Sequence, residues 1–176
     1  PNDTNERTGY SAIIDGLRRD NYQWEKLVLA QTNSIPENAT VLVIAGPTTD
    51  LLDTELELLR GYLQKQGKLL VMLDPPDLKQ PRPLPRLTGL LRDWGVNVTD
   101  SIVVDVSGLT NVATVPVPAP PYPSHVITDR FNLITMFPMA RAVTAAEGAP
   151  AERVAQPFVQ TTPRAWAEVD LASLEN

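Results

Sequence analysis

The chain has 176 residues, of which 43% are hydrophobic and 20% are charged, and its formal net charge is −6. This length is enough for one domain with a real core, or for one domain with an appendage. The negative balance, with no basic stripe interleaved with aromatic residues, argues against a nucleic-acid partner. The absence of cysteine excludes disulfides, thiolate metal sites and cysteine nucleophiles.

The N-terminal part begins with a polar, turn-rich stretch. The spacing of Ile13, Ile14 and Leu17 predicts a helix over Ser11 to Asp20 with these three residues on its buried face. Partial alternation predicts a strand over Tyr22 to Ala30. Because a doubly wound domain normally begins with a strand, we expect the first strand to lie upstream of Pro1, in a longer protein.

The segment from Thr40 to Pro76 has the pattern of a strand–helix–strand unit. Val41 to Ala45 and Leu69 to Leu73 are unbroken apolar runs, as in strands buried on both faces of a parallel sheet. Between them an amphipathic helix is expected, with Asp50 as its N-cap and Gly67 as the left-handed residue at its end.

The next segments complete the expected layer. They are a short helix over Leu87 to Trp94 and short strands at Val96 to Val98 and Ile102 to Val106. The fold class is therefore α/β, a Rossmann-like or flavodoxin-like, mostly parallel sheet flanked by helices. We assign residues 1–115 to an α/β core lacking its first strand, and residues 116–176 to a less regular extension of the same domain.

Prolines concentrate in two loops, residues 75–85 and residues 116–123. These loops are expected to be stiff and extended, either as rigid surface connections or as surfaces for a partner. Arg82 and Arg86 flank prolines and are interpreted as solvated loop charges. Beyond these loops, a strand end turning into a helix capped by Thr128 is expected, followed by strands at Leu133 to Met139 and Val154 to Thr161.

Ligands of such folds bind at the carboxyl ends of the strands. Four carboxylates are expected near those ends and would suit a hard cation if they gathered: Asp50, Asp74, Asp77 and Asp105. Neither GxxxxGK[ST] nor GxGxxG is present, so a nucleotide site is not expected. The single histidine, His125, is better explained as a capping or packing residue than as the base of a catalytic pair.

Motifs distributed over nearly the whole chain resemble the extracytoplasmic domain of the auxiliary, gliding-motility-type component of ABC transport systems, an uncharacterised transport-system family. They include Gly9-Tyr10-Ser11, Val41-Leu42-Val43-Ile44-Ala45-Gly46-Pro47, Gly67-Lys68-Leu69-Leu70-Val71 and Asp74-Pro75. Later motifs are Trp94-Gly95-Val96, Val104-Asp105, His125-Val126-Ile127-Thr128, Ala140-Arg141-Ala142-Val143 and Thr162-Pro163-Arg164-Ala165-Trp166-Ala167-Glu168.

The resemblance implies a class I glutamine amidotransferase-like fold, similar also to a domain of intraflagellar transport proteins. In amidotransferases the nucleophile is a cysteine, whereas this chain has Asp74-Pro75-Pro76 after the corresponding strand. It therefore implies a non-catalytic, cofactor-free binding or coupling domain on the extracytoplasmic side of a bacterial membrane. Its partners would be an ABC permease and ATPase, with a possible envelope ligand, and segments outside this chain would anchor it.

The residues expected at the binding edge are Gly46, Pro47, Thr48, Asp74, Pro75, Asp105 and His125, because strand-end loops converge there. An alternative from another class is a hydrolase that uses carboxylates at the same edge, with or without a metal ion.

Overall fold

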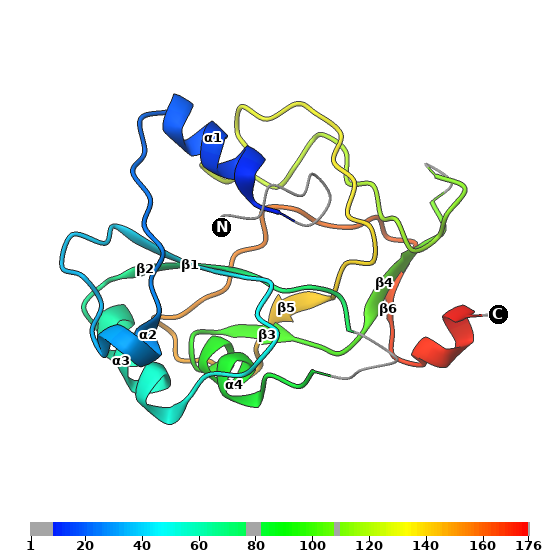
Figure 1. Cartoon of the computed structure of the whole chain (residues 1–176). Helices are drawn as coiled ribbons and strands as arrows, with labels where there is room; N and C mark the ends of the chain where they lie inside the picture. The colour runs from blue at the N-terminus through cyan, green and yellow to red at the C-terminus, as the bar shows by residue number, and fades with distance from the viewer. Residues whose placement is uncertain (1–8, 77–81, 108–109, 176) are drawn as a thin grey trace. The chain divides into compact units, whose positions relative to one another are not determined.

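The structure is a computed structural model that describes residues 9–76, 82–107 and 110–175 (Figure 1). The chain divides into two compact units, residues 1–39 and residues 40–176. The second unit contains all the strands of the described chain and most of its buried side chains.

The N-terminal unit contains two helices, α1 (Ser11–Arg19) and α2 (Leu29–Thr32). Helix α1 is confirmed, but of its three expected core residues only Ile14 is buried. The strand expected over Tyr22 to Ala30 is wrong. A strand needs a neighbour to pair with, and the described part of this unit offers no second extended segment. Instead, Trp24 packs its ring beneath the Arg18 guanidinium, whose carbon lies 5.8 Å from the ring centroid.

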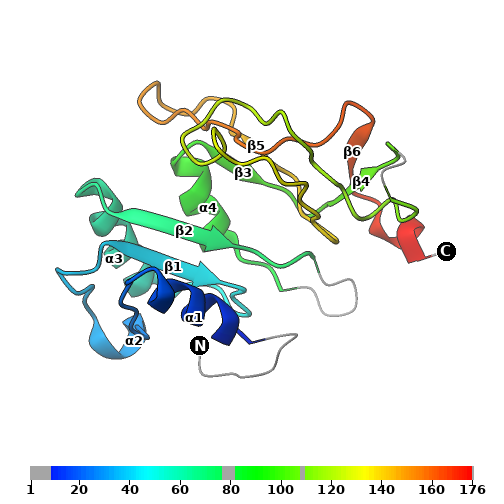
Figure 2. The ribbon, with the colours of Figure 1, turned by 90° about the horizontal axis from the view of Figure 1, so that it is seen from above.

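The second unit opens with the expected strand–helix–strand motif, which is confirmed. Strands β1 (Val41–Ala45) and β2 (Lys68–Met72) pair in parallel, and α3 (Asp53–Gln64) connects them. Figures 1 and 2 show α3 against one face of this pair. Apolar residues of α3 at helical spacing turn toward the interior, where Leu56, Leu59 and Leu63 are buried.

The turn from α3 into β2 depends on Tyr62. Its hydroxyl accepts a hydrogen bond from the Lys68 amide at 3.2 Å and lies 3.4 Å from the Thr40 carbonyl, so it contacts the residues that open both strands. The left-handed residue at the helix end is Gln66, with φ of 65°, and not Gly67 as expected. Gly67 is required for another reason, because a Cβ there would overlap the ring of Tyr62.

Beyond β2 the sheet differs from the expected one. Helix α4 (Pro85–Asp93) leads into β3 (Val96–Val98), and β4 (Ile102–Asp105) begins after three intervening residues. Strand β3 pairs antiparallel with β5 (Val143–Ala145), and β4 pairs antiparallel with β6 (Ala165–Glu168). A short 3₁₀ helix, Leu171–Glu175, follows.

The expectation of a mostly parallel sheet is therefore wrong for the described residues, in which β1 and β2 are the one parallel pair. A parallel partner needs a crossover connection of about a dozen residues or more. The chain between β3 and β4 is far shorter than that, and the C-terminal third instead returns to pair with both strands from the opposite direction.

The segment of residues 114–123, called the proline-rich segment, explains why the strand expected over Leu133 to Met139 is not regular. The amides of Thr135, Phe137 and Met139 donate to the carbonyls of residues 118, 116 and 114, respectively, so the two segments run antiparallel. Residues 116 and 118 are prolines, which have no N–H to return the bond. The result is a ladder with hydrogen bonds in one direction.

Two further expectations are not met. Residues 154–161 form no strand, and residues 125–129 form a turn rather than a strand followed by a helix. Thr128 is buried in that turn, where its hydroxyl donates to the Pro123 carbonyl at 2.9 Å. These segments carry apolar residues without a paired neighbour, so periodicity alone misassigns them.

Gly95 and Gly148 provide a matched test of backbone strain and packing. Both have positive φ, 83° and 71°, but a Cβ on Gly95 would overlap the Arg153 carbonyl oxygen whereas one on Gly148 meets open space. We expect Gly148→Ala to lower the free energy of unfolding by about 1–3 kcal/mol from φ strain alone. Gly95→Ala should cost clearly more in urea denaturation, and equal losses would contradict the packing contribution.

Candidate functional site

Five of the expected site residues lie at one edge of the β1–β2 pair, where both strands end. The amide of Gly46 donates to the Met72 carbonyl at 2.9 Å, so the loops leaving the two strands start side by side. Gly46 has a φ of 53°, which turns the chain out of β1 toward Pro47 and Thr48. Asp74 and Pro75 follow β2 and are exposed.

Asp74 is held through its backbone and not through its carboxylate. The Nε of Arg141 donates to the Asp74 carbonyl, and the same guanidinium forms an ion pair with Asp100. Arg141 therefore ties the end of β2 to the loop before β4. The Asp74 side chain has no partner among the described residues and remains available at the surface.

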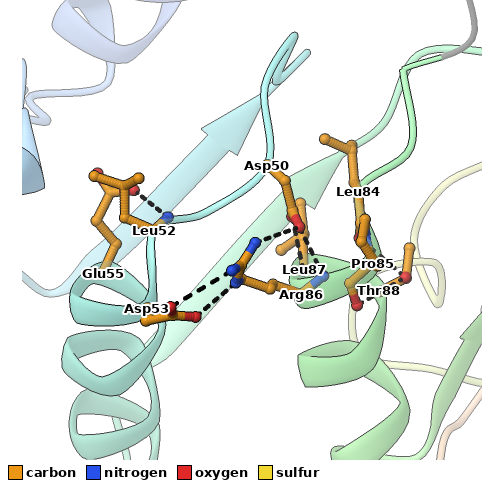
Figure 3. Close-up of polar contacts among 9 residues, drawn as sticks. All are labelled: Asp50, Leu52, Asp53, Glu55, Leu84, Pro85, Arg86, Leu87 and Thr88. Atoms are coloured by element: carbon orange, nitrogen blue, oxygen red, sulfur yellow. Dashed lines mark hydrogen bonds and ion pairs between the residues drawn. The ribbon is translucent and has the colours of Figure 1, made fainter.

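The carboxylate of Asp50 does not cap its own helix, as expected, but the N-terminus of α4 (Figure 3). Its two oxygens accept from the amides of Arg86 at 2.9 Å and Leu87 at 3.1 Å. The N-cap of α3 is Leu52, whose amide donates to the Glu55 carboxylate at 2.9 Å. Each helix N-terminus at this edge thus already has a carboxylate in place.

Arg86 is not a solvated loop charge, as expected from its proline neighbours, but part of α4. Its Nε lies 2.7 Å from Asp53 Oδ1, and its Nη1 lies 3.8 Å from Asp50 Oδ2 (Figure 3). The hydrogen bond to Asp53 and the charges of Asp53 and Asp50 raise the pKa of Arg86, against a small opposing effect of burial. An incoming anion would have to compete with both carboxylates for these groups.

Asp105 lies in a different place, at the end of β4. Its residue is 4% exposed, and Oδ1 accepts from the Ser107 amide and the Thr162 hydroxyl, both at 2.8 Å. Oδ2 has no hydrogen-bond partner in the described part of the chain. Burial raises the pKa of Asp105, but the hydrogen bonds from Thr162 and Ser107 together outweigh it and leave the pKa below the usual value.

His125 is a packing and turn residue in this structure. Its ring stacks on Phe158 with centroids 5.1 Å apart, and its Nδ1 accepts from the Ile127 amide at 3.1 Å. The carboxylate of Asp129 accepts from the His125 amide at 3.0 Å and closes the same turn. Its contacts join residues 125–129 to the segment around Phe158.

The carboxylates expected to gather into a cation site do not do so. Asp50 caps α4, Asp74 is exposed at the end of β2, and Asp105 is bound to Thr162, while Asp77 lies outside the described residues. Across residues 9–76, 82–107 and 110–175, no three histidine, aspartate or glutamate side chains are grouped closely enough to hold a metal ion.

A pocket of about 420 Å³ lies at the opposite edge, where α3 and α4 end and β2 and β3 begin. None of its lining residues is among the site residues that the sequence predicts. Arg153 donates to the Asp93 carbonyl at 2.7 Å and places its guanidinium carbon 4.2 Å from the centroid of the Trp94 ring. Cations at a helix C-terminus are stabilised by the helix dipole. Arg92 and Trp94, close to Gly95 in the sequence, are a local signal for the end of α4 at this pocket. Nothing in the sequence near them indicates that Arg153 also lines it.

No helix in the described part of the chain is long and apolar enough to cross a membrane.

Residues 2–175 match the family described as ABC-type uncharacterized transport system, so the chain belongs to that family, as the motifs predict. Membership of this family implies, in general terms, that the chain has partners in a transport system. No curated protein is similar enough to this chain to count as a relative.

The structure is similar to the mmIFT52 N-terminal domain, with a TM-score of 0.64 and 19% sequence identity. The similarity covers 91% of this chain and 73% of that chain. This likeness shows the fold alone, and it confirms the expected relation to a domain of intraflagellar transport proteins.

The role of Asp50 can be tested against its neighbour Asp53. The Asp50 side chain is 13% exposed and Asp53 is 81% exposed. We expect Asp50→Ala to lower the free energy of unfolding by about 1 kcal/mol, because two amides of α4 lose their acceptor. Asp53→Ala should cost less, because exposed ion pairs contribute little. Urea denaturation measures both, and a larger loss for Asp53→Ala would contradict the assignment.

The lowered pKa of Asp105 predicts an acid-dependent loss of stability. The carboxyl of the unfolded chain has a pKa of about 3.9, and that of the folded chain is lower. The charged form therefore stabilises the fold above the unfolded pKa, and this contribution disappears as the pH falls through the folded pKa. Asp105→Asn should therefore be less stable than wild type at neutral pH and lose less on acidification.

Thr162→Val removes the hydroxyl donor and should change stability in the same direction as Asp105→Asn, while Thr161→Val is the matched control. Melting temperatures measured between about pH 6 and pH 3 compare the four proteins. If the Asp105→Asn profile runs parallel to that of the wild type, Asp105 is not the group responsible.

Proposed function

We propose that this chain is a non-catalytic binding or coupling domain of a membrane-anchored auxiliary protein in an ABC transport system. It would lie on the extracytoplasmic side of a bacterial membrane and engage a permease, an ATPase-bound complex or an envelope ligand. Membership of the transport-system family over residues 2–175 is the observation that carries the proposal.

The contacts at the strand-end edge support a binding role without chemistry. The helix N-termini that could hold an anion are closed by Asp50 and Glu55, which belong to the chain itself. The nucleophile of the amidotransferase fold is a cysteine, and this sequence has none. The hydrolase alternative needs Asp50, Asp74 and Asp105 to converge, but their contacts hold them in three separate places.

We place the partner contact at the edge formed by Gly46, Pro47, Thr48, Asp74 and Pro75. Thr48, Asp74 and Pro75 are exposed there, and the backbone that carries them is fixed by the Gly46–Met72 and Arg141–Asp74 hydrogen bonds. A fixed backbone with exposed side chains loses little entropy when it binds. Asp105 and His125 serve the fold, through Thr162 and Phe158, respectively.

The proposal is tested by expressing the gene with its native flanks, purifying the product from detergent-solubilised membranes and identifying co-purifying proteins by mass spectrometry. We expect a permease and an ATPase to co-purify with the protein. Recovery of the protein from the soluble fraction without either partner would contradict the proposed function.

The position of the contact is tested by a charge reversal in the same preparation. Asp74→Lys should reduce recovery of the partners, because the exposed carboxylate lies at the proposed edge. Asp20→Lys, an exposed aspartate in the N-terminal unit, is the matched control. Equal recovery with both variants would leave the transporter role standing and remove this edge as the contact.

A further inference from the structure

The segment of residues 133–139, called the edge segment, exposes several large apolar side chains. Leu133, Ile134 and Met136 are 67%, 66% and 67% exposed. The whole run from residue 131 to residue 140 contains no charged residue, although the chain carries a net charge of −6. A contiguous apolar surface of this kind marks an interaction site.

The backbone of the edge segment is paired on one side. The amides of Thr135, Phe137 and Met139 face the proline-rich segment and donate to residues 118, 116 and 114. The Tyr122 hydroxyl strengthens this side, since it donates to the Leu133 carbonyl at 2.8 Å and lies 3.1 Å from the Thr135 hydroxyl. Residues 134–137, between a bend at Leu133 and a turn at residues 138–139, are therefore held in place before any partner arrives.

The other side of the edge segment is open. Alternate residues of an extended chain direct their N–H and C=O groups to opposite sides, so those of Ile134 and Met136 point away from the proline-rich segment. In the part of the chain that the structure describes, neither residue has a backbone hydrogen bond. Pro138, the next residue in this outward series, has no N–H to offer.

We propose that a second copy of this chain pairs with the open side of the edge segment, antiparallel, about a two-fold axis at Thr135. In this register Ile134 of one copy faces Met136 of the other, and each such pair exchanges both of its N–H···O=C bonds. The open groups lie symmetrically around Thr135, so the edge is complementary to itself.

Two further features favour a second copy as the occupant. Because the edge segment is uncharged, two copies meet there without the like-charge repulsion expected elsewhere between molecules of net charge −6. Pairing also brings the exposed Leu133, Ile134 and Met136 of both copies together, which removes apolar surface from water. Pro138 limits the ladder to the short stretch that two copies share.

The absence of cysteine makes the register directly testable. At a non-hydrogen-bonded antiparallel pair the two Cα atoms are about 4.5 Å apart, which lies within the disulfide range of about 4.4–6.8 Å. Thr135→Cys should therefore form a disulfide-linked dimer on mild oxidation. Asn132→Cys is the matched control, because it lies beyond the bend at Leu133 and does not face its own counterpart in this register.

Non-reducing electrophoresis detects the linked dimer, and analytical ultracentrifugation of the unmodified chain measures its association. We expect a dimer in solution, cross-linking of Thr135→Cys and little cross-linking of Asn132→Cys. A chain that stays monomeric, equal cross-linking of both variants, or a dimer that Thr135→Cys cannot link would each overturn the proposal.

A second pair of variants separates backbone pairing from apolar contact and does not depend on Thr135. Met136→Pro removes the outward N–H and should weaken the dimer by about tenfold or more. Met136→Gln keeps the N–H and should weaken it less. Ile134→Cys and Met136→Cys, which face each other in the proposed register, should form a heterodimeric disulfide when mixed after separate purification. This result would support the register even if Thr135→Cys folds poorly, and failure to link would contradict it.

Discussion

The carboxylate of Asp50 makes the interaction on which the arrangement of the second unit depends. It accepts two amides of α4 from a position 36 residues earlier in the chain. A nine-residue helix is marginal by itself, because forming its first turn costs more than the first hydrogen bonds return. Once Asp50 caps it, α4 can bury Leu87 and Leu90 and deliver the chain to β3. The loop after β1 thus determines where the later strands begin.

The parts of the fold that sequence patterns predict are those whose signals are local. β1, α3 and β2 follow from two apolar runs and a helical repeat of leucines, and each of these patterns lies within a few residues of the structure it produces. Helix α4 and strand β3 are predicted for the same reason. The position of five candidate residues at the β1–β2 edge also follows, because parallel strands must end on the same side.

What the sequence does not predict depends on partners distant along the chain. Asp50 has the residue type and the position of a local N-cap. Nothing nearby in the sequence indicates that it binds the amides of Arg86 and Leu87 instead. Strands β5 and β6 are short and exposed, so their assignment requires knowledge of β3 and β4. The amides of Thr135 and Phe137 bond the facing segment as in a β-ladder, but buried prolines opposite them and a turn at residues 138–139 prevent a regular strand.

Helix α4 is held at both ends by residues from other segments. Asp50 binds its first turn, and Arg153 donates to the Asp93 carbonyl in its last turn. Local fraying, which usually begins at the ends of a short helix, therefore requires the release of a loop at one end or the other. The amides of α4 are then expected to exchange with solvent together with those loops. The loop after β1 and the segment that carries Arg153 are thus joined through one helix, although they are far apart in the sequence.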